Sequence, residues 1–280
     1  MIQPTLIIHG GAGKSIALQS RLQSVRQKIK KIVSLAYQRL QDSRALDAAV
    51  YAVTLLENDP EFNAGTGSML QSDGKARLSA SVMDGTLLRF AGVINIENIK
   101  NPVLVAKALL EKKDRVLACD GAVRFARSLG FKSYDPRTPA AIKRWKKALE
   151  IKSDTVGACA LDRHGNLASA TSTGGRGLEF PGRVSDSGMP AATYADIFCA
   201  ISATGTGEEI MDQGLAVRIA AYVESGLSIS EAFKRAFKIV HSRGHRMGAI
   251  GLDRKGRIHQ ATSTESLIYG WQKGRSQKIF

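Results

Sequence analysis

The chain has 280 residues, and 44% of them are hydrophobic, so it is long enough to bury a full core and does not have the composition of a disordered protein. Its net charge of +15 raises the question of a nucleic-acid partner. The basic residues are scattered along predicted helices, without interleaved aromatic residues, zinc-finger spacing or an RNA-binding signature, so we interpret them as a solvated surface.

Cysteine spacing and hydropathy indicate the compartment. Cys119, Cys159 and Cys199 are widely spaced in the sequence and form no C-x-x-C pair that could hold zinc or a redox disulfide. We therefore expect small buried side chains in a reduced compartment. The N-terminal apolar run is short and lacks the basic start and cleavage site of a signal peptide. No segment reaches the ~18 apolar residues of a membrane span. These features predict a cytoplasmic protein with no membrane or nucleic-acid partner.

The first element, residues 5–15, reads TLIIHGGAGKS and looks like a strand entering a phosphate-binding loop. A P-loop needs a glycine five positions before the glycine of Gly-Lys-Ser, and Ile8 stands there, so the glycines serve another purpose. Apolar residues from Leu18 to Leu40 recur near the 3.6-residue period and predict an amphipathic helix. A second helix is expected after Ser43, which can cap it, and should end at Asn-Asp-Pro, residues 58–60.

The middle of the chain alternates turns and helices. Residues 62–68, FNAGTGS, predict a glycine-rich turn, and SDGK at residues 72–75 predicts a hairpin. Residues 102–129 predict two helices. Residues 133–153 are basic and contain prolines, and we interpret them as a linker.

An internal repeat follows this linker. VGACALDRHGNLASATST at residues 156–173 is echoed by MGAIGLDRKGRIHQATST at residues 247–264, and each copy predicts a strand, an Asp-Arg-x-Gly turn and a second strand. Strands in both halves with helices near the chain ends favour stacked sheets covered by helices. The copies differ in what precedes them, Asp154-Thr155 in the first and His245-Arg246 in the second.

Six motifs occur in the order HGGAG, FNAGTGS, SDTVGACALD, ATSTGG, PGRVSD and ATGTGE. Each is weak alone, but together they resemble the plant-type asparaginase and isoaspartyl peptidase family from Ile7 to about Asp253. The resemblance implies an α+β fold of the N-terminal nucleophile hydrolase type, a four-layer αββα sandwich, as one domain over residues 1–280. It also implies that an inactive precursor cleaves itself between Asp154 and Thr155 into chains 1–154 and 155–280, which stay associated and form a dimer of cleaved units.

The implied nucleophile is Thr155. A threonine hydroxyl needs an adjacent base, and cleavage before Thr155 frees an α-amine whose pKa of about 7.7 to 8.0 lets the residue carry its own base. By resemblance, Thr173 orients that hydroxyl, while the Thr204 hydroxyl and the Gly205 amide stabilise the oxyanion. Without the other motifs, Thr173 would be interpreted as an ordinary strand residue and Thr-Gly-Thr-Gly as an ordinary turn.

Substrate binding is implied for the PGRVSD motif. Arg183 is suited to clamp a carboxylate bidentately, and Asp186 to pair with an ammonium group, helped by the carbonyl of Gly207. A surface ion pair is the alternative interpretation of these charges. The family usually reads Gly-Arg-Val-Gly-Asp-Ser-Pro here, so Ser185 and Gly188 are departures that alter the shape of the pocket.

The remaining motifs have supporting roles by resemblance. Gly10 and Gly11 form a glycine loop near the nucleophile, and Asn63 supports Thr155. No cofactor is required. A structural sodium ion is expected on main-chain carbonyls of a different loop, LENDPEFNAGT at residues 56–66. The residues expected to hold it are Leu56, Glu57, Asp59, Phe62, Ala64 and Thr66.

The resemblance implies a hydrolase that cleaves isoaspartyl (β-aspartyl) dipeptides and deamidates L-asparagine. Two related alternatives are a glycosylasparaginase, which is disfavoured by the absence of a signal peptide, and a taspase-like protease, which would need longer insertions to grip a polypeptide. A basic nucleic-acid-binding protein is a remote alternative from another class.

Overall fold

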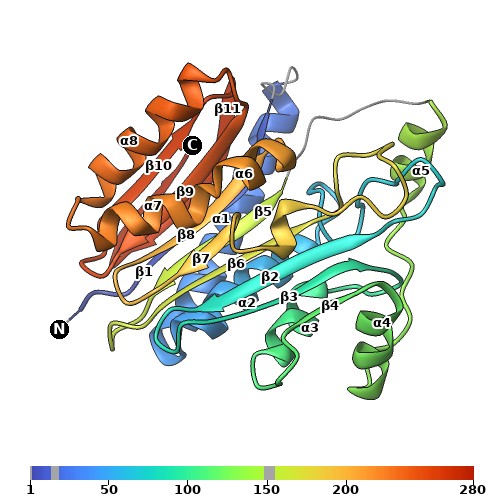
Figure 1. The fold of residues 1–280 in the computed structure, drawn as a ribbon, viewed down its shortest axis with the longest axis horizontal. Helices are drawn as coiled ribbons and strands as arrows, with labels where there is room; N and C mark the ends of the chain where they lie inside the picture. Colours follow the sequence, from blue (N-terminus) through green and yellow to red (C-terminus); the bar gives the residue numbers. More distant parts are fainter. Residues whose placement is uncertain (1, 14–18, 148–154) are drawn as a thin grey trace.

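The computed structural model describes residues 2–13, 19–147 and 155–280, and the strands of this part form two sheets (Figure 1). The strands are β1 (Thr5–Gly13), β2 (Leu78–Asp84), β3 (Arg89–Ile96), β4 (Val116–Ala118), β5 (Val156–Leu161), β6 (Leu167–Thr173), β7 (Thr193–Ala195), β8 (Cys199–Gly205), β9 (Met247–Asp253), β10 (Ile258–Thr262), β11 (Ser266–Lys273) and β12 (Ser276–Ile279). The larger sheet has the order β12-β11-β1-β5-β6-β2-β3-β4, and the smaller one β10-β9-β8-β7. Of these pairings only β3 with β4 is parallel.

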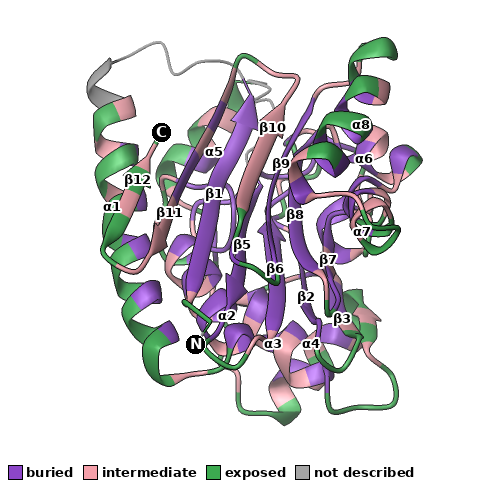
Figure 2. Cartoon of the chain, turned by 90° about the vertical axis from the view of Figure 1, so that its left-hand side faces the viewer, coloured by how far each residue is buried: buried purple, intermediate pink, exposed green. Residues whose placement is uncertain are grey.

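The described part of the chain contains eight α-helices. They are α1 (Gln19–Asp42), α2 (Ala45–Glu57), α3 (Pro102–Leu109), α4 (Cys119–Ser128), α5 (Pro139–Lys146), α6 (Gly207–Gln213), α7 (Leu215–Glu224) and α8 (Ile229–Ser242). One apolar cluster joins α1 to α4 to the larger sheet, and a second joins α7 and α8 to the smaller sheet. Figure 2 shows the strands as mostly buried, whereas α1 turns an exposed face outward.

A third apolar cluster joins the two sheets. Strand side chains alternate between faces, so Leu6 and Ile8 of β1 pack against the helices while Ile7, between them, points toward the smaller sheet. There it shares a cluster with Ile250 and Leu252 of β9. This confirms the expectation of an α+β fold with two sheets and helices gathered on them.

The first helix is confirmed, because Val25, Ile29 and Val33 are buried on one face of α1. The predicted cap of the second helix is wrong. Ser43 donates to the carbonyl of Arg39 at 2.8 Å in the preceding helix, and the amide of Ala45 at the start of α2 instead donates to the Asp162 carboxylate at 3.0 Å. A side chain distant in sequence thus caps α2, which no local pattern could indicate.

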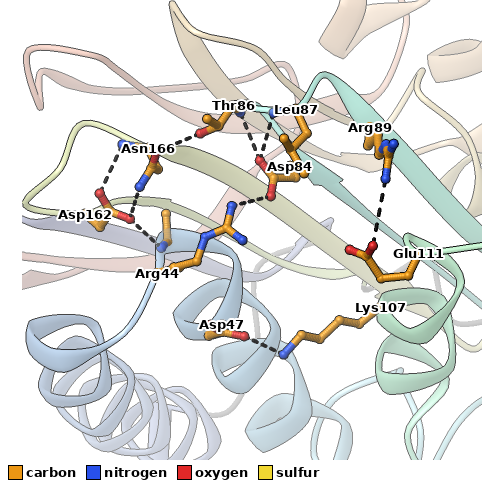
Figure 3. A network of polar contacts seen from close by, with 11 residues as sticks. Arg44, Asp47, Asp84, Thr86, Leu87, Arg89, Lys107, Glu111, Asp162 and Asn166 are labelled. Carbon is orange, nitrogen blue, oxygen red and sulfur yellow. Dashed lines mark hydrogen bonds and ion pairs between the residues drawn. The ribbon is translucent and has the colours of Figure 1, made fainter.

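Figure 3 shows how this cap belongs to a network at one end of the larger sheet. Asp162 also binds the side chain of Asn166 in its own turn, at 2.8 Å, and the Arg44 guanidinium donates to Asp84 at the end of β2, at 2.8 Å. The network therefore ties the start of α2 to the β5–β6 turn and to β2.

The internal repeat is confirmed as two strand-turn-strand units. β5 and β6 lie in the larger sheet, whereas β9 and β10 lie in the smaller one. The turns use the same chemistry, since Asp162 and Asp253 each accept backbone amides of their turn, and Gly165 and Gly256 have φ values of +87° and +67°.

Two local predictions are wrong. SDGK makes a turn in which Gly74 donates to the carbonyl of Gln71, but β2 begins only at Leu78, so the turn does not join paired strands. The predicted linker contains α5, because Thr138 caps that helix by accepting the amide of Ala141 at 3.2 Å. Residues 148–153 of the linker lie outside the described part. The two helices expected in residues 102–129 are confirmed, with the short strand β4 between them.

The cysteines and the C-terminal residues also bear on the predictions. Cys159 and Cys199 are buried as expected, but Cys119 is exposed because it starts α4 beyond the edge strand β4. After the second repeat, β11 returns along β1 and β12 adds the outer strand of the larger sheet. Within the described ranges, none of the helices is long and apolar enough to cross a membrane.

Candidate active site

A pocket of about 340 Å³ opens where the ends of β1, β5, β6, β8 and β9 meet, a size typical of small-molecule sites. It brings together most of the residues predicted from the motifs, including Thr155, Thr173, Arg183, Asp186 and Gly207. Its other walls are formed by Ala12, Gly13, Gly175, Arg176, Gly177, Ser185, Gly205, Thr206, Glu208, Arg246 and Thr264.

Thr155 lines this pocket and comes immediately before β5, and only 2% of the residue is exposed. Its hydroxyl donates to the Oγ1 of Thr173 at 3.5 Å. The Thr173 Oγ1 in turn accepts the amide of Gly175 at 3.2 Å, so the turn after β6 fixes the orienting group. Asp154, the other half of the expected cleavage junction, lies outside the described residues.

Asn63 supports this arrangement through the turn after β6. Its amide donates to the carbonyl of Gly175 at 2.5 Å, and its oxygen accepts the amide of Met69 at 2.9 Å. Asn63 therefore braces the turn that follows Thr173, and the support that it gives to Thr155 passes through that turn.

The HGGAG motif was expected to be a loop but is strand β1, with a register shift against β11 between His9 and Gly11. Gly10 lies within this bulge, where a side-chain carbon would come 2.7 Å from the ring of Phe62, and Gly11 has a φ of +119°. The glycines therefore bend the strand, and Ala12 and Gly13 reach the pocket wall.

The predicted oxyanion groups lie at the end of β8. Thr204 is fully buried and is not among the residues that line the pocket, unlike its neighbour Gly205; within the described residues its hydroxyl has no hydrogen-bond partner. Gly205 has a φ of +137°, and a side-chain carbon there would lie 2.5 Å from the carbonyl oxygen of Arg246. Only glycine can bring its backbone this close to β9.

Arg183 differs from the expectation in one respect. Its Nε and Nη2 already form a bidentate pair with Glu208, both at 2.9 Å, and Nη1 of Arg176 lies 3.8 Å from the same carboxylate. A guanidinium has five N–H donors, so the Nη1–Nη2 edge of Arg183 is left for a second carboxylate. Glu208 thus holds Arg183 in place instead of excluding a ligand.

Asp186 is buried beside this arginine. Burial raises the pKa of its carboxyl to about 6, against the charge of Arg183 and the hydroxyl of Ser185, which both lower it. Ser185, the departure from the family pattern, donates to Oδ1 of Asp186 at 3.0 Å. The other oxygen, Oδ2, has no hydrogen-bond partner within the described part of the chain, so Asp186 has acceptor capacity for a cationic ligand.

Gly207 separates the two charged groups. A side-chain carbon at this position would lie 2.5 Å from Nη2 of Arg183 and 2.6 Å from Oδ1 of Asp186. The absence of a side chain at Gly207 therefore lets the guanidinium and the carboxylate both approach the backbone at this point.

We expect Gly207→Ala to raise KM by at least about tenfold, because the methyl group displaces Arg183 or Asp186 from the geometry that a substrate needs. Steady-state kinetics with a melting curve will check this. Gly121→Ala is a matched control, since Gly121 is helical, and a side-chain carbon there meets nothing within 4 Å. Equal KM values for the two variants would contradict the assigned role of Gly207.

Sequence reasoning missed several residues of the pocket. Glu208 ends the ATGTGE motif and Arg176 directly follows ATSTGG, yet nothing in their spacing marked either as a neighbour of Arg183. Arg246 and Thr264 could have been found, because the internal repeat places them opposite Thr155 and Thr173.

His9, Ser202 and Thr171 form a buried polar network between the two sheets. His9 is fully buried, its Nε2 lies 2.9 Å from the Ser202 hydroxyl, and that hydroxyl lies 2.8 Å from Oγ1 of Thr171. Burial lowers the pKa of His9 to about 3, so the imidazole is neutral at physiological pH. The network joins β1 and β6 of one sheet to β8 of the other through neutral groups.

The residues expected to hold sodium begin at the last two residues of α2, Leu56 and Glu57, and continue into the loop after it. Their main-chain oxygens are the hard ligands that sodium accepts, and within the described residues the carbonyls of Phe62, Ala64 and Thr66 receive no hydrogen bond. The carbonyls of Leu56, Glu57 and Asp59 already accept the amides of Asp59, Thr66 and Phe62, at 3.2, 2.8 and 3.1 Å. The donor set is compatible with the ion, which stays a prediction. Across the described residues there is no group of three or more His, Cys, Asp or Glu side chains that could hold a metal.

Comparisons with known proteins cover nearly the whole chain. The Asparaginase family model matches residues 2–280, which extends the resemblance to the C-terminal strands. An isoaspartyl peptidase/L-asparaginase of Nostoc sp. is 41% identical, over 98% of this chain and 93% of the relative. A plant-type L-asparaginase of Thermococcus kodakarensis is 36% identical over 96% of each chain, and an isoaspartyl peptidase/L-asparaginase of Bos taurus is 37% identical over 89% of this chain and 86% of its own.

Proposed function

Because this chain belongs to the Asparaginase family, we propose that it hydrolyses L-asparagine to aspartate and ammonia and cleaves the β-aspartyl bond of isoaspartyl dipeptides. The observation that carries this function is the convergence of Thr155 and Thr173 with Arg183 and Asp186 on one pocket. The first pair suits an acyl-transfer reaction, and the second suits the zwitterionic head of an amino acid.

We further propose the maturation and assembly that the family resemblance implies. The single domain is cleaved before Thr155 into chains 1–154 and 155–280, and the cleaved units form a dimer. The two sheets with helices on their outer sides support a four-layer αββα arrangement of the N-terminal nucleophile hydrolase type. A cytoplasmic location stays our prediction from the sequence.

In the proposed mechanism the Thr155 hydroxyl attacks the side-chain carbonyl carbon of the substrate while its own α-amine takes the proton. Thr204 and Gly205 stabilise the negative oxygen, and Thr173 holds the nucleophile. The tetrahedral intermediate collapses when the protonated amine gives its proton to the leaving nitrogen, which departs as ammonia or as an amino acid. Water then hydrolyses the ester on Thr155 and releases aspartate.

Both substrates present the same head group. The Nη1–Nη2 edge of Arg183 binds the α-carboxylate, and Asp186 binds the α-ammonium group with help from the carbonyl of Gly207. A coupled assay of aspartate release from L-asparagine and from a β-aspartyl dipeptide tests the function. Failure to release aspartate from either compound by the matured protein would refute it.

The pH dependence follows from two groups. The free α-amine must be neutral to act as base, so kcat/KM should rise through an apparent pKa near 8. Asp186 must be ionised to bind the ammonium group, and because burial raises its pKa to about 6, kcat/KM falls further as pH drops below that value. The logarithm of kcat/KM should therefore rise with a slope of about 2 below pH 6 and about 1 from pH 6 to 8.

A pH profile of the wild-type enzyme and of Asp186→Asn checks this assignment. The variant should lose the limb near pH 6, because an amide does not titrate, and should keep the limb near pH 8. A flat wild-type profile between pH 6 and 9 would rule out the α-amine as base.

A further inference from the structure

We propose that Arg246 binds the C-terminal carboxylate of the leaving residue, which gives this enzyme a preference for isoaspartyl dipeptides with a free C-terminus. The inference rests on the proposed function, since it concerns the part of the substrate beyond the scissile bond. Three observations carry it: the place of Arg246 in the internal repeat, its lack of a partner among the described residues, and its position next to the predicted oxyanion residue.

The internal repeat places Arg246 where the first copy has Thr155. Thr155 precedes β5 in the larger sheet, Arg246 precedes β9 in the smaller sheet, and both line the same pocket. The last residues of the copies, Thr173 and Thr264, line it as well. The pocket is therefore built by two equivalent halves, one of which carries the nucleophile and the other a guanidinium.

Among the arginines of the pocket, Arg183 pairs with Glu208 at 2.9 Å, and Arg176 lies 3.8 Å from the same carboxylate. Arg246 forms no ion pair with any described residue, and its Nη2, although buried, has no hydrogen-bond partner within that part of the chain. A buried guanidinium nitrogen without an acceptor is costly, and a carboxylate is the ligand that best satisfies it.

The backbone of Arg246 is fixed independently of its side chain. Its amide donates to Oε2 of Glu209 at 2.6 Å, and its carbonyl accepts the amide of Thr206 at 2.9 Å. The same carbonyl limits the space at Gly205, the predicted oxyanion residue. Arg246 is therefore anchored beside the point where the scissile carbonyl binds, and the side chain can be changed without removing either contact.

The substrate has a group that matches this position. An isoaspartyl dipeptide carries two carboxylates, of which the α-carboxylate of the aspartyl residue is assigned to Arg183. The second belongs to the leaving residue, on the other side of the scissile bond. Asparagine lacks this second carboxylate, because its leaving group is ammonia. Arg246 therefore distinguishes the two substrate classes and contributes to specificity.

A pair of substrates isolates this contact. β-Aspartyl-leucine and β-aspartyl-leucinamide share the scissile bond and the head group, but the amide lacks the C-terminal carboxylate. We expect the wild type to favour the acid by at least about tenfold in kcat/KM, and Arg246→Met to bring the ratio close to one. Arg246→Lys should keep part of the preference through its charge. Effects on folding, maturation or chemistry change both substrates equally and cancel in the ratio.

Arg176→Met is the matched control, because it removes a charge from the same pocket but from a side chain that faces Glu208; it should keep the wild-type ratio. Arg246→Gln provides a second variant if the methionine variant does not fold. Three results would overturn the inference, provided that the protein still releases aspartate. They are a wild-type acid-to-amide ratio near one, a ratio unchanged in both Arg246→Met and Arg246→Gln, and a ratio that falls equally in Arg176→Met. Failure of the wild type to hydrolyse any of these substrates would instead refute the proposed function and the inference with it.

Discussion

Thr155→Ala should remain a single chain of 280 residues and should hydrolyse neither asparagine nor β-aspartyl dipeptides. The variant lacks the hydroxyl that is proposed to attack both the peptide bond before residue 155 and the substrate amide. A loss of at least about a thousandfold in kcat/KM is expected, since no other group replaces a missing nucleophile. Intact-mass measurement after prolonged incubation and an aspartate-release assay will check both results.

The control for this experiment is Thr54→Ala. Thr54 lies on α2 and donates its hydroxyl to the carbonyl of Val50 at 2.8 Å, away from the pocket. That variant should mature into fragments 1–154 and 155–280 like the wild type. A wild-type protein that stays at full length and still hydrolyses β-aspartyl dipeptides would exclude the N-terminal mechanism, because an uncleaved Thr155 has no free α-amine.

The fold was predictable where the pattern of residues is local or repeated. The amphipathic period of α1 and the two copies of the Asp-Arg-x-Gly turn each specify their own element. The cap of α2 was not predictable, because the carboxylate that accepts the Ala45 amide belongs to Asp162. Helix α5 was missed for another reason, since prolines and basic residues in 133–153 matched a linker while Thr138 caps a helix there.

The site was predictable only through the order of its motifs. Thr155 and Arg183 are ordinary residues in isolation, and their meeting in one pocket depends on two sheets packing together. The pairing of Arg183 with Glu208 could not be inferred, because the two residues are 25 positions apart and no local pattern indicates that they are neighbours. Arg246 was visible in the repeat, but its meaning required the observation that no described carboxylate pairs with it.

The second large effect is expected for Arg183→Ala, which should lose on the order of a hundredfold or more in kcat/KM for both substrates. The α-carboxylate then has no guanidinium to bind. Glu208, which lies 2.9 Å from Nε and Nη2 of Arg183 in the wild type, keeps only the longer pair with Arg176 at 3.8 Å, so its negative charge is less compensated near the same place. Arg183→Lys should rescue only partly, because a point charge cannot serve Glu208 and the substrate through two planar edges. Arg44→Ala is the control, since that arginine pairs with Asp84 outside the pocket.

Maturation and substrate hydrolysis should respond differently to the loss of Arg183. The peptide bond before Thr155 presents no free α-carboxylate, so fragment formation in Arg183→Ala should stay near the wild-type rate. The double variant Arg183→Ala with Glu208→Gln also removes the negative charge of Glu208. The activity that it regains over Arg183→Ala measures the repulsion between Glu208 and the substrate carboxylate. The deficit that persists measures the lost clamp. We compare fragment formation on a gel and aspartate release across these variants. Near-wild-type turnover by Arg183→Ala would remove Arg183 from the substrate site. Failed maturation of Arg183→Ala would instead make Arg183 part of the cleavage machinery.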